Sequence, residues 1–243
     1  MNKVLLMSGA SSDIGVAILS ATIDQYDHVI AHYYGDKKEL QSLYEKHKEK
    51  ITMVESDFSS EEETNQFVEH VAALPFEVTD IIHLPAGVFR YTKFNKLSWG
   101  NFDKDIQISL RSFILILNKF LPNMAKKKYG KVVTMLSHCT CNMPPKYLSS
   151  YVTVKYALLG LVKSLAVEYA DKNIRINGIS PTMMETKFLD NIPLLLKEQS
   201  AHNSPTGENL KVSEVVPIIK FLMSDDGSSI TGQNIAITNG NTI

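Results

Sequence analysis

KVLLMSGASSDIG, residues Lys3 to Gly15, joins a short apolar run to a turn containing two glycines and to the start of a helix. Gly9 and Gly15 lack Cβ atoms, so the turn can be tight and the helix can pack closely against it. The turn amides and the positive end of the helix favour a pyrophosphate. We therefore expect a phosphate-binding turn contacting its ligand through Gly9, Ser11, Ser12, Asp13, Ile14 and Gly15. An ordinary strand-to-helix turn is the alternative.

Asp13 occupies the position of the middle glycine in the usual dinucleotide fingerprint. Aspartate is favoured just before the first helical turn, so we expect Asp13 to cap the helix. A carboxylate beside phosphates weakens their binding unless it turns outward.

Short runs rich in Val and Ile alternate with longer amphipathic segments along the chain. Strands are expected at 3–7, 28–33, 51–56, 79–84, 131–136, 173–180 and 234–238, and helices from Ile14, Lys37, Ser60, at 99–126, 149–170 and 213–223. This alternation predicts an α/β fold, a doubly wound (Rossmann) seven-stranded parallel sheet with helices on both faces and ligands at the carboxyl ends of the strands. A single domain over 1–243 is expected.

Residues 181–210 interrupt this alternation, because Pro193, Pro205 and Gly207 break any apolar period. We expect a mobile, irregular lid that determines the choice of substrate.

The composition is that of an ordinary globular protein, with 243 residues, 44% hydrophobic residues and a net charge of -1. The chain has no long basic run, so nucleic acid is not expected as a partner. It shows neither the pattern of a signal peptide nor an apolar run of about 18 residues, so association with a membrane is not expected either. A cytoplasmic protein is expected. Cys139 and Cys141 are expected to be reduced thiols, and with His138 they supply too few donors to favour a metal site.

The helix SSYVTVKYALLGLVKSLAVEYA, Ser149 to Ala170, opens with Tyr151 and Lys155, which are four residues apart and share one face. An ammonium near a phenol lowers the phenol's pKa, so the pair could exchange a proton with a carbonyl or hydroxyl oxygen. Ser137, at the end of a β-branched run, could hydrogen-bond the same oxygen. An ordinary core helix is the alternative.

The end of the second strand, with His32, Tyr33 and Tyr34, carries no acid for a ribose 2′-hydroxyl. Lys37 and Lys38 follow within reach of a 2′-phosphate. These residues favour NADP over NAD, with contacts expected from Tyr33, Tyr34 and Lys37. Solvated lysines are the alternative.

Over nearly its whole length, the chain resembles the short single-domain members of the short-chain dehydrogenase/reductase family. The matching segments are SGASSDIG, Asp57-Phe58, Ala86-Gly87, Ser137 with Tyr151 and Lys155, Ile174 to Thr186, and Ile230 to Gly240. The resemblance implies that Asp57 and Phe58 contact adenine, and that Ala86 and Gly87 line the cofactor site. It also implies that Pro181 and Thr186 hold the nicotinamide carboxamide.

Four positions depart from that family's pattern. Leu84 and Pro85 replace two asparagines, Thr182 replaces a glycine, and Ser109 stands where a helix asparagine supports a water-linked proton relay to the lysine. We place Ser109 in the catalytic set, with a relay that runs through an added water or runs slowly.

The leading hypothesis is an NADPH-dependent reductase of a ketone or 3-oxoacyl substrate, in which Tyr151 is the proton donor. A dinucleotide-binding sensor or inactive partner subunit is the alternative, and an epimerase or dehydratase is less favoured.

The helices over 102–121 and 151–170 are apolar on more than one face, which favours a homotetramer that light scattering would detect.

Overall fold

The computed structural model describes residues 2–241 and contains a seven-stranded parallel sheet with the order β3-β2-β1-β4-β5-β6-β7. This confirms the doubly wound fold expected from the sequence. In chain order the strands are β1 (Val4–Ser8), β2 (His28–Tyr33), β3 (Ile51–Glu55), β4 (Asp80–His83), β5 (Gly130–Met135), β6 (Ile174–Pro181) and β7 (Asn234–Ile237).

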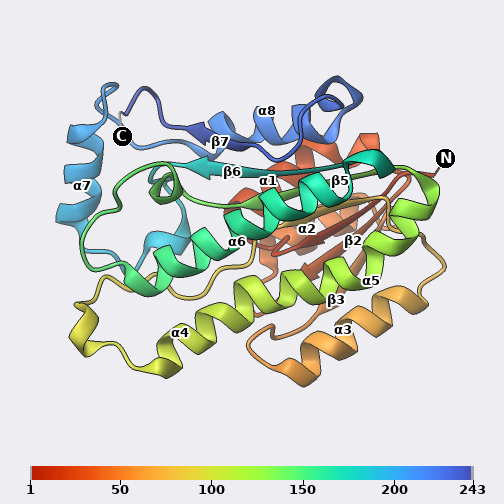
Figure 1. Ribbon diagram of the computed structural model, residues 1–243, viewed down its shortest axis with the longest axis horizontal. Helices are drawn as coiled ribbons and strands as arrows, with labels where there is room; N and C mark the ends of the chain where they lie inside the picture. Colours follow the sequence, from red (N-terminus) through yellow and green to blue (C-terminus); the bar gives the residue numbers. More distant parts are fainter. Residues whose placement is uncertain (1, 242–243) are drawn as a thin grey trace.

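Helices cover both faces of the sheet (Figure 1). One face carries α1 (Asp13–Thr22), α2 (Lys38–Lys46) and α8 (Val212–Met223), and the other carries α3 (Glu61–Ala73), α4 (Trp99–Ile106), α5 (Ser112–Lys127) and α6 (Ser149–Glu168). Successive side chains of a strand point to opposite faces, so Leu5 and Met7 join one core and Leu6 joins the other.

The winding direction of the sheet reverses between β1 and β4. These strands are neighbours, with Ser8 opposite His83, although the chain completes β2 and β3 between them. The loops that follow β1 and β4 therefore diverge to opposite faces and leave a crevice at the carboxyl edge.

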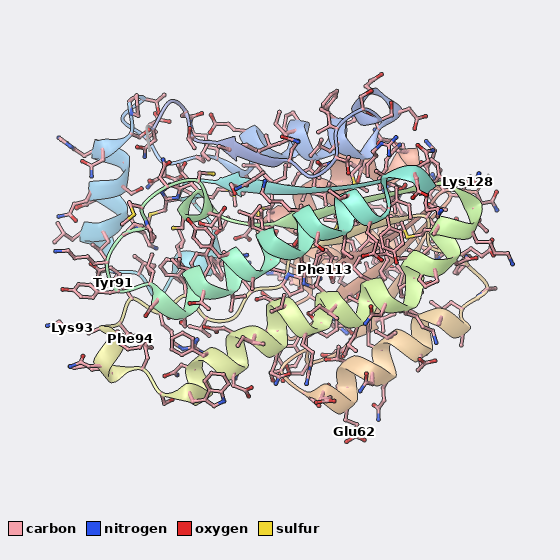
Figure 2. The ribbon with its side chains drawn as sticks, viewed as in Figure 1. Glu62, Tyr91, Lys93, Phe94, Phe113 and Lys128 are labelled. Carbon is pink, nitrogen blue, oxygen red and sulfur yellow. The ribbon has the colours of Figure 1, made fainter. Side chains whose placement is uncertain are left out.

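The helix expected over 99–126 contains a π-helical turn at Gln107–Arg111, between α4 and α5. The Ser112 hydroxyl donates to the Ile108 carbonyl at 2.6 Å within this turn. Farther along α5, Phe113 is fully buried against the sheet and stacks on His83 (Figure 2). An apolar pattern does not reveal one extra residue in a helical turn, so the sequence did not predict this bulge.

The segment 181–210 contains a helix, α7 (Leu194–Asn203), at the carboxyl edge of the sheet (Figure 1). The expectation of a wholly irregular lid was wrong for these residues. Pro193 is the N-cap of α7 and Pro205 follows its end, so the prolines bound the helix. No side chain of α7 is buried, which is why the helix has no apolar period to detect.

Among the described residues, α6 alone has the length and apolar composition of a membrane-crossing helix. Its Val154, Leu158 and Val162 side chains are buried in the core on one face of the sheet. These contacts are those of a core helix of a globular domain.

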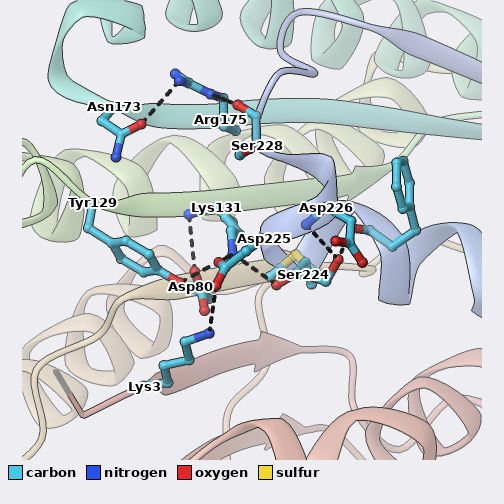
Figure 3. Close-up of polar contacts among 12 residues, drawn as sticks. Lys3, Asp80, Tyr129, Lys131, Asn173, Arg175, Ser224, Asp225, Asp226 and Ser228 are labelled. Atoms are coloured by element: carbon cyan, nitrogen blue, oxygen red, sulfur yellow. Dashed lines mark hydrogen bonds and ion pairs between the residues drawn. The ribbon is translucent and has the colours of Figure 1, made fainter.

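A buried acid, Asp80, lies at the amino end of β4 (Figure 3). The Oδ1 atom of Asp80 accepts the Lys131 amide at 3.1 Å, whereas Oδ2 has no partner in the described part of the chain. The Lys131 ammonium instead donates to Asp225 at 2.6 Å. Burial raises the pKa of Asp80 to about 7, against the opposing charges of Lys131 and Lys3.

Asp80 should make the stability of this protein fall as the pH rises. Its folded pKa of about 7 exceeds the value of about 3.9 for an unfolded aspartate, so the folded state binds the proton more tightly. The contribution is complete below about pH 4 and is lost between about pH 4 and pH 7. Asp80→Asn cannot titrate, so the unfolding free energy of wild type relative to the variant should fall by roughly 2 kcal/mol between pH 5 and pH 7.5.

Urea unfolding at the two pH values measures this difference. Asp24→Asn, which changes an exposed aspartate, is the matched control and should show no such trend. A wild type and an Asp80→Asn variant that respond identically to pH would contradict the assignment.

Candidate active site

A cleft of about 650 Å³ opens at the carboxyl edge of the sheet. Its wall is formed by the loops after β1, β4, β5 and β6 and by the start of α6. Fifteen residues expected at the site line this cleft, namely Gly9, Ser11, Ser12, Asp13, Ile14, Tyr34, Asp57, Phe58, Ala86, Gly87, Ser137, Tyr151, Lys155, Pro181 and Thr186. Four other expected residues that the structure describes lie outside this wall, namely Gly15, Tyr33, Lys37 and Ser109.

The turn after β1 depends on its two glycines. Gly9 has a φ of +74°, a region that residues with a Cβ atom rarely adopt. A Cβ atom on Gly15 would lie 2.5 Å from the Gly9 carbonyl oxygen, so only glycine lets α1 begin this close to the turn. Gly15 lies outside the cleft wall, although the sequence analysis expected a ligand contact there, and it acts by letting α1 begin close to the turn. Asp13 and Ile14, at the start of α1, line the cleft, where a helix N-terminus favours a pyrophosphate.

Ser12 caps α1, and the expectation that Asp13 does so was wrong. The Ser12 hydroxyl accepts the Gly15 amide at 3.1 Å and donates to the Gly9 carbonyl at 2.8 Å. Asp13 is the first helical residue, and its Oδ2 atom accepts the backbone amide of Lys187 at 2.7 Å. Its carboxylate thus ties the phosphate-binding turn to the segment after β6.

His32 joins the same turn to Ser56 and Phe58 in the cleft wall. Its Nδ1 atom accepts the Gly9 amide at 3.1 Å, which leaves Nε2 to donate to the Ser56 carbonyl at 3.0 Å. The ring stacks on Phe58 with the centroids 3.9 Å apart. Burial lowers the pKa of His32 to about 4, so the ring is neutral at physiological pH. The sequence analysis missed this contact of His32 with the turn, because it asked only whether the end of β2 carries an acid.

Lys37 is directed away from the cleft, contrary to the sequence expectation. Its ammonium donates to the Tyr33 hydroxyl at 2.9 Å and lies over the Tyr33 ring. Within the described chain, the lysines of the cleft wall are Lys104, Lys155 and Lys187. The Lys187 ammonium lies 3.4 Å from Glu39, 3.9 Å from Asp36 and 4.0 Å from Asp13.

Tyr151 and Lys155 lie together at the start of α6. The Lys155 ammonium is 5.6 Å from the centroid of the Tyr151 ring and donates to the Met135 carbonyl at 2.6 Å. Lys155 is only 3% exposed, and this burial lowers its pKa to about 8. Its charge state is therefore sensitive to small changes around neutral pH.

The expected lowering of the Tyr151 pKa by Lys155 is not what the structure shows. Burial raises the pKa of Tyr151 above that of a free tyrosine, and a side-chain hydrogen bond with Ser137 only partly opposes this effect. The Ser137 oxygen also accepts the Cys139 amide at 3.3 Å. The phenol is thus protonated at neutral pH and lies beside the Ser137 hydroxyl.

Two phenylalanines cover Tyr151, and sequence reasoning missed both. The ring centroids of Phe89 and Tyr151 are 4.9 Å apart, and Phe188 lies 5.7 Å from Phe89. Phe89 follows the Ala86-Gly87 turn, and Phe188 follows Lys187 in the segment after β6. Only the general expectation of a lid over 181–210 pointed toward Phe188.

Ser109 lies close to Tyr151 and Lys155. Its side chain is buried, and its carbonyl accepts the Nε2 proton of His83 at 2.9 Å. A separate cavity of about 10 Å³ is lined by Ser109, Tyr151 and Lys155 among other residues. The structure therefore brings Ser109 close to Tyr151 and Lys155, but outside the cleft.

Cys139 and Cys141 are free thiols in the loop after β5. In the part of the chain that the structure describes, no three His, Cys, Asp or Glu side chains gather in a way that could hold a metal ion.

Comparisons with known proteins identify relatives over almost the entire chain. A family model described as Enoyl-(Acyl carrier protein) reductase matches residues 9–242. The chain is 28% identical over 238 residues to the 3-oxoacyl-[acyl-carrier-protein] reductase FabG of Rickettsia conorii, covering 98% of this chain and 96% of that protein. It is 28% identical over 243 residues to FabG of Thermotoga maritima, covering 98% and 97%.

Solved structures show the same fold. The structure described as "ElxO with NADP Bound" has a TM-score of 0.86 at 23% identity and covers 99% of each chain. Levodione reductase has a TM-score of 0.87 at 23% identity, covering 98% of this chain and 96% of its own.

Removal of the Asp13 carboxylate should loosen the segment around Lys187. Asp13→Ala deletes the acceptor of the Lys187 amide, so that amide should exchange with solvent more readily, with an opening free energy lower by about 1 kcal/mol. Hydrogen exchange followed by mass spectrometry measures the change. Asp24→Ala, which removes an exposed aspartate, is the control. Unchanged exchange around Lys187 in Asp13→Ala would show that the contact does not hold the segment.

Proposed function

The chain belongs to the short-chain dehydrogenase/reductase family of NAD(P)-dependent oxidoreductases, and we propose that it reduces the carbonyl of a 3-oxoacyl thioester or a related ketone with NADPH. One observation carries this proposal. The hydroxyls of Ser137 and Tyr151 adjoin in the cleft wall, next to a buried lysine. Two such donors suit one carbonyl oxygen.

The residues of the cleft fit a dinucleotide along its length. The Gly9 turn and the start of α1 would hold the pyrophosphate, Asp57 and Phe58 the adenine, and Pro181 and Thr186 the nicotinamide end. The bound cofactor would supply the hydride. Both glycine positions support this assignment, since a Cβ atom at either would meet backbone or side-chain atoms within 3.4 Å.

The protein's own groups would control the proton. Ser137 orients the substrate oxygen, and Tyr151 donates its phenolic proton to that oxygen as negative charge develops there. Lys155 then returns a proton to the phenolate, and its lowered pKa of about 8 makes the ammonium a competent donor near neutral pH. Phe89 and Phe188 exclude water from the reacting groups.

The character of the cleft wall supports an acyl substrate. Phe89, Phe188, Met183 and Met184 line the region around Tyr151 and after β6, and the wall is largely apolar. The names of the curated relatives given above point to the same substrate class. A thioester-linked chain would lie against these side chains while its 3-oxo group meets Ser137 and Tyr151.

The preference for NADP(H) now depends on a different lysine. Lys37 is bound to Tyr33, whereas Lys187 reaches the adenine end of the cleft beside Asp36. We assign the 2′-phosphate to Lys187, whose ammonium would exchange its contacts with Asp13, Asp36 and Glu39 for the phosphate, against the repulsion of these carboxylates. The cytoplasmic location and the homotetramer stay predictions from the sequence.

Tyr151→Phe should abolish most turnover and keep cofactor binding. The variant retains the ring that packs on Phe89 but lacks the donated proton, so kcat should fall by about 10²–10⁴-fold. Loss of NADPH absorbance with a panel of ketones and a 3-oxoacyl thioester measures turnover, and calorimetry measures NADPH binding. Full turnover in the variant would refute the proton-donor role.

The same assays on wild type separate the alternative functions. If wild type binds NADPH but reduces nothing in the panel, the chain is a sensor or an inactive subunit. If it reduces only a 2-enoyl thioester, the reaction is reduction of a carbon–carbon double bond and not of a carbonyl.

NADPH should stabilise the protein more than NADH. Ligand at about 100 times its Kd adds about 2.7 kcal/mol, which corresponds to a rise in Tm of roughly 5–10 °C for a chain of this size. Lys187→Met should remove the advantage of NADPH, and Lys38→Met, which changes an exposed lysine outside the cleft wall, should preserve it. Greater stabilisation by NADH would reverse the preference and make Asp36 the partner of a ribose hydroxyl.

A further inference from the structure

Exposed apolar side chains gather on two loops beside the cleft. These loops, residues 88–99 after β4 and residues 141–148 after β5, are called the rim below. The large apolar side chains that the rim exposes are those of Val88, Tyr91, Phe94, Trp99, Met143 and Tyr147. Phe94 is 71% exposed and Met143 is 93% exposed, so neither side chain contributes to the core. A concentration of this kind marks a surface that meets a partner.

The two loops of the rim form one continuous surface. The Thr92 amide donates to the Tyr147 carbonyl at 2.9 Å. The rings of Tyr91 and Tyr147 meet edge to face, with their centroids 5.2 Å apart. Figure 2 shows Tyr91, Lys93 and Phe94 together at one end of the molecule.

The rim borders the opening of the cleft. Val88 and Phe89 from its first loop, and Pro145 and Leu148 from its second, line the cleft wall. Val88 and Pro145 are also exposed, so they lie where the cleft meets the surface. Phe89 packs against Tyr151 in the interior. A partner that covers the rim would therefore lie directly at the entrance to the reacting groups.

The charge of the rim is entirely positive. Its two loops contain Arg90, Lys93, Lys96 and Lys146 and no Asp or Glu, although the chain as a whole has a net charge of -1. Arg90 is paired with Asp105, whereas the three lysines are exposed. The rim therefore complements an anionic surface.

The mixture of aromatic and basic side chains favours a lipid bilayer over a protein as that surface. Lysine is depleted in the cores of protein interfaces. At a membrane surface, in contrast, Trp, Tyr and Phe lie at the level of the headgroups while lysines contact anionic lipids. The helix α7, which exposes Leu194 and Leu195, adds apolar side chains at the same end of the molecule (Figure 1).

We propose that the rim docks this protein on the surface of an anionic lipid bilayer. Phe94 and Met143 enter the headgroup region, and Lys93, Lys96 and Lys146 contact the lipid phosphates. The opening of the cleft then faces the lipid. The sequence expectation of no membrane partner came from the lack of a signal peptide and of a long apolar run, and a surface assembled from two separate loops leaves neither pattern.

This docking does not require the proposed reductase function, but its consequence for the substrate rests on that function. A ketone or thioester with a long acyl chain would pass from the bilayer into the cleft along Pro145 and Leu148. If wild type binds vesicles but reduces no carbonyl, the reductase function fails and the docking surface stands.

Sedimentation with lipid vesicles tests the proposal. The protein should bind vesicles of phosphatidylglycerol and phosphatidylcholine, bind more weakly as salt is added, and bind pure phosphatidylcholine least. The double variant Lys93→Gln, Lys96→Gln should lose about 25-fold in affinity, since each lysine at an anionic surface contributes about fivefold.

The matched control is Lys126→Gln with Lys128→Gln. It removes two exposed lysines at the end of α5, and Figure 2 shows Lys128 at the opposite end of the molecule from Lys93. This control should bind as wild type does. Equal losses in the two double variants would mean that the charge of the whole protein attracts the vesicles, and would overturn the proposal.

Phe94→Ser with Met143→Ser tests the apolar contribution of the rim. Vesicle affinity should fall about 10-fold or more, because two inserted side chains lose their apolar surface. Both residues lie outside the cleft wall, so turnover of a short, water-soluble ketone and thermal stability should stay at their wild-type values. Undiminished binding by this variant would exclude insertion of the rim.

The orientation on the bilayer can be read from Trp99, the single tryptophan of the chain. Phe94 packs against Phe102, which is one helical turn beyond Trp99, so Trp99 lies close to the proposed point of insertion. Its fluorescence should shift to shorter wavelength on anionic vesicles and should be quenched by lipids with brominated acyl chains. Binding without either change would place another face on the bilayer and overturn the proposal.

A protein that stays in solution at every lipid concentration would also overturn it. The rim would then be an interface with another protein. Light scattering of wild type and of Phe94→Ser would show whether a second copy of this chain is that partner.

Discussion

The hydrogen bond from the Lys155 ammonium to the Met135 carbonyl is the interaction on which the site depends. It ties the start of α6 to the carboxyl end of β5 at 2.6 Å, in an environment that is almost fully closed to water. A charged amine enters such a place only when its protons are satisfied. This requirement places Tyr151, one helical turn earlier, in the wall of the cleft, and places Ser137, two residues beyond Met135, beside the phenol.

Burial has opposite consequences for the two members of this pair. The uncharged form is favoured in both, so the pKa of Tyr151 rises while that of Lys155 falls to about 8. The phenol is therefore held as a donor and the amine is close to titrating, which is a suitable arrangement for a proton that must be delivered and then replaced.

The other half of the cleft is built from contacts between segments that are distant in the chain. His32 connects the Gly9 turn to Ser56 and Phe58, and Asp13 connects the start of α1 to Lys187. Each of these side chains spans between loops at the carboxyl edge of the sheet. A dinucleotide lying along that edge would therefore contact loops that are already connected to one another by these hydrogen bonds. Phe188 and Lys187 belong to the segment after β6, which the Asp13 contact holds in place.

The sequence by itself determined the order of strands and helices, the glycine turn and the Ser137, Tyr151 and Lys155 set, because these features depend on local spacing and on backbone sterics. It failed where the outcome depended on which distant group a side chain meets. Lys37 bonds to Tyr33, Asp13 meets the Lys187 amide, and Ser12 takes the capping role. The tertiary structure also decided the π-helical turn, the helix α7 and the placing of Asp105 against Gly87. Those features arise from packing between segments far apart in the chain, and no local pattern of residues encodes such contacts.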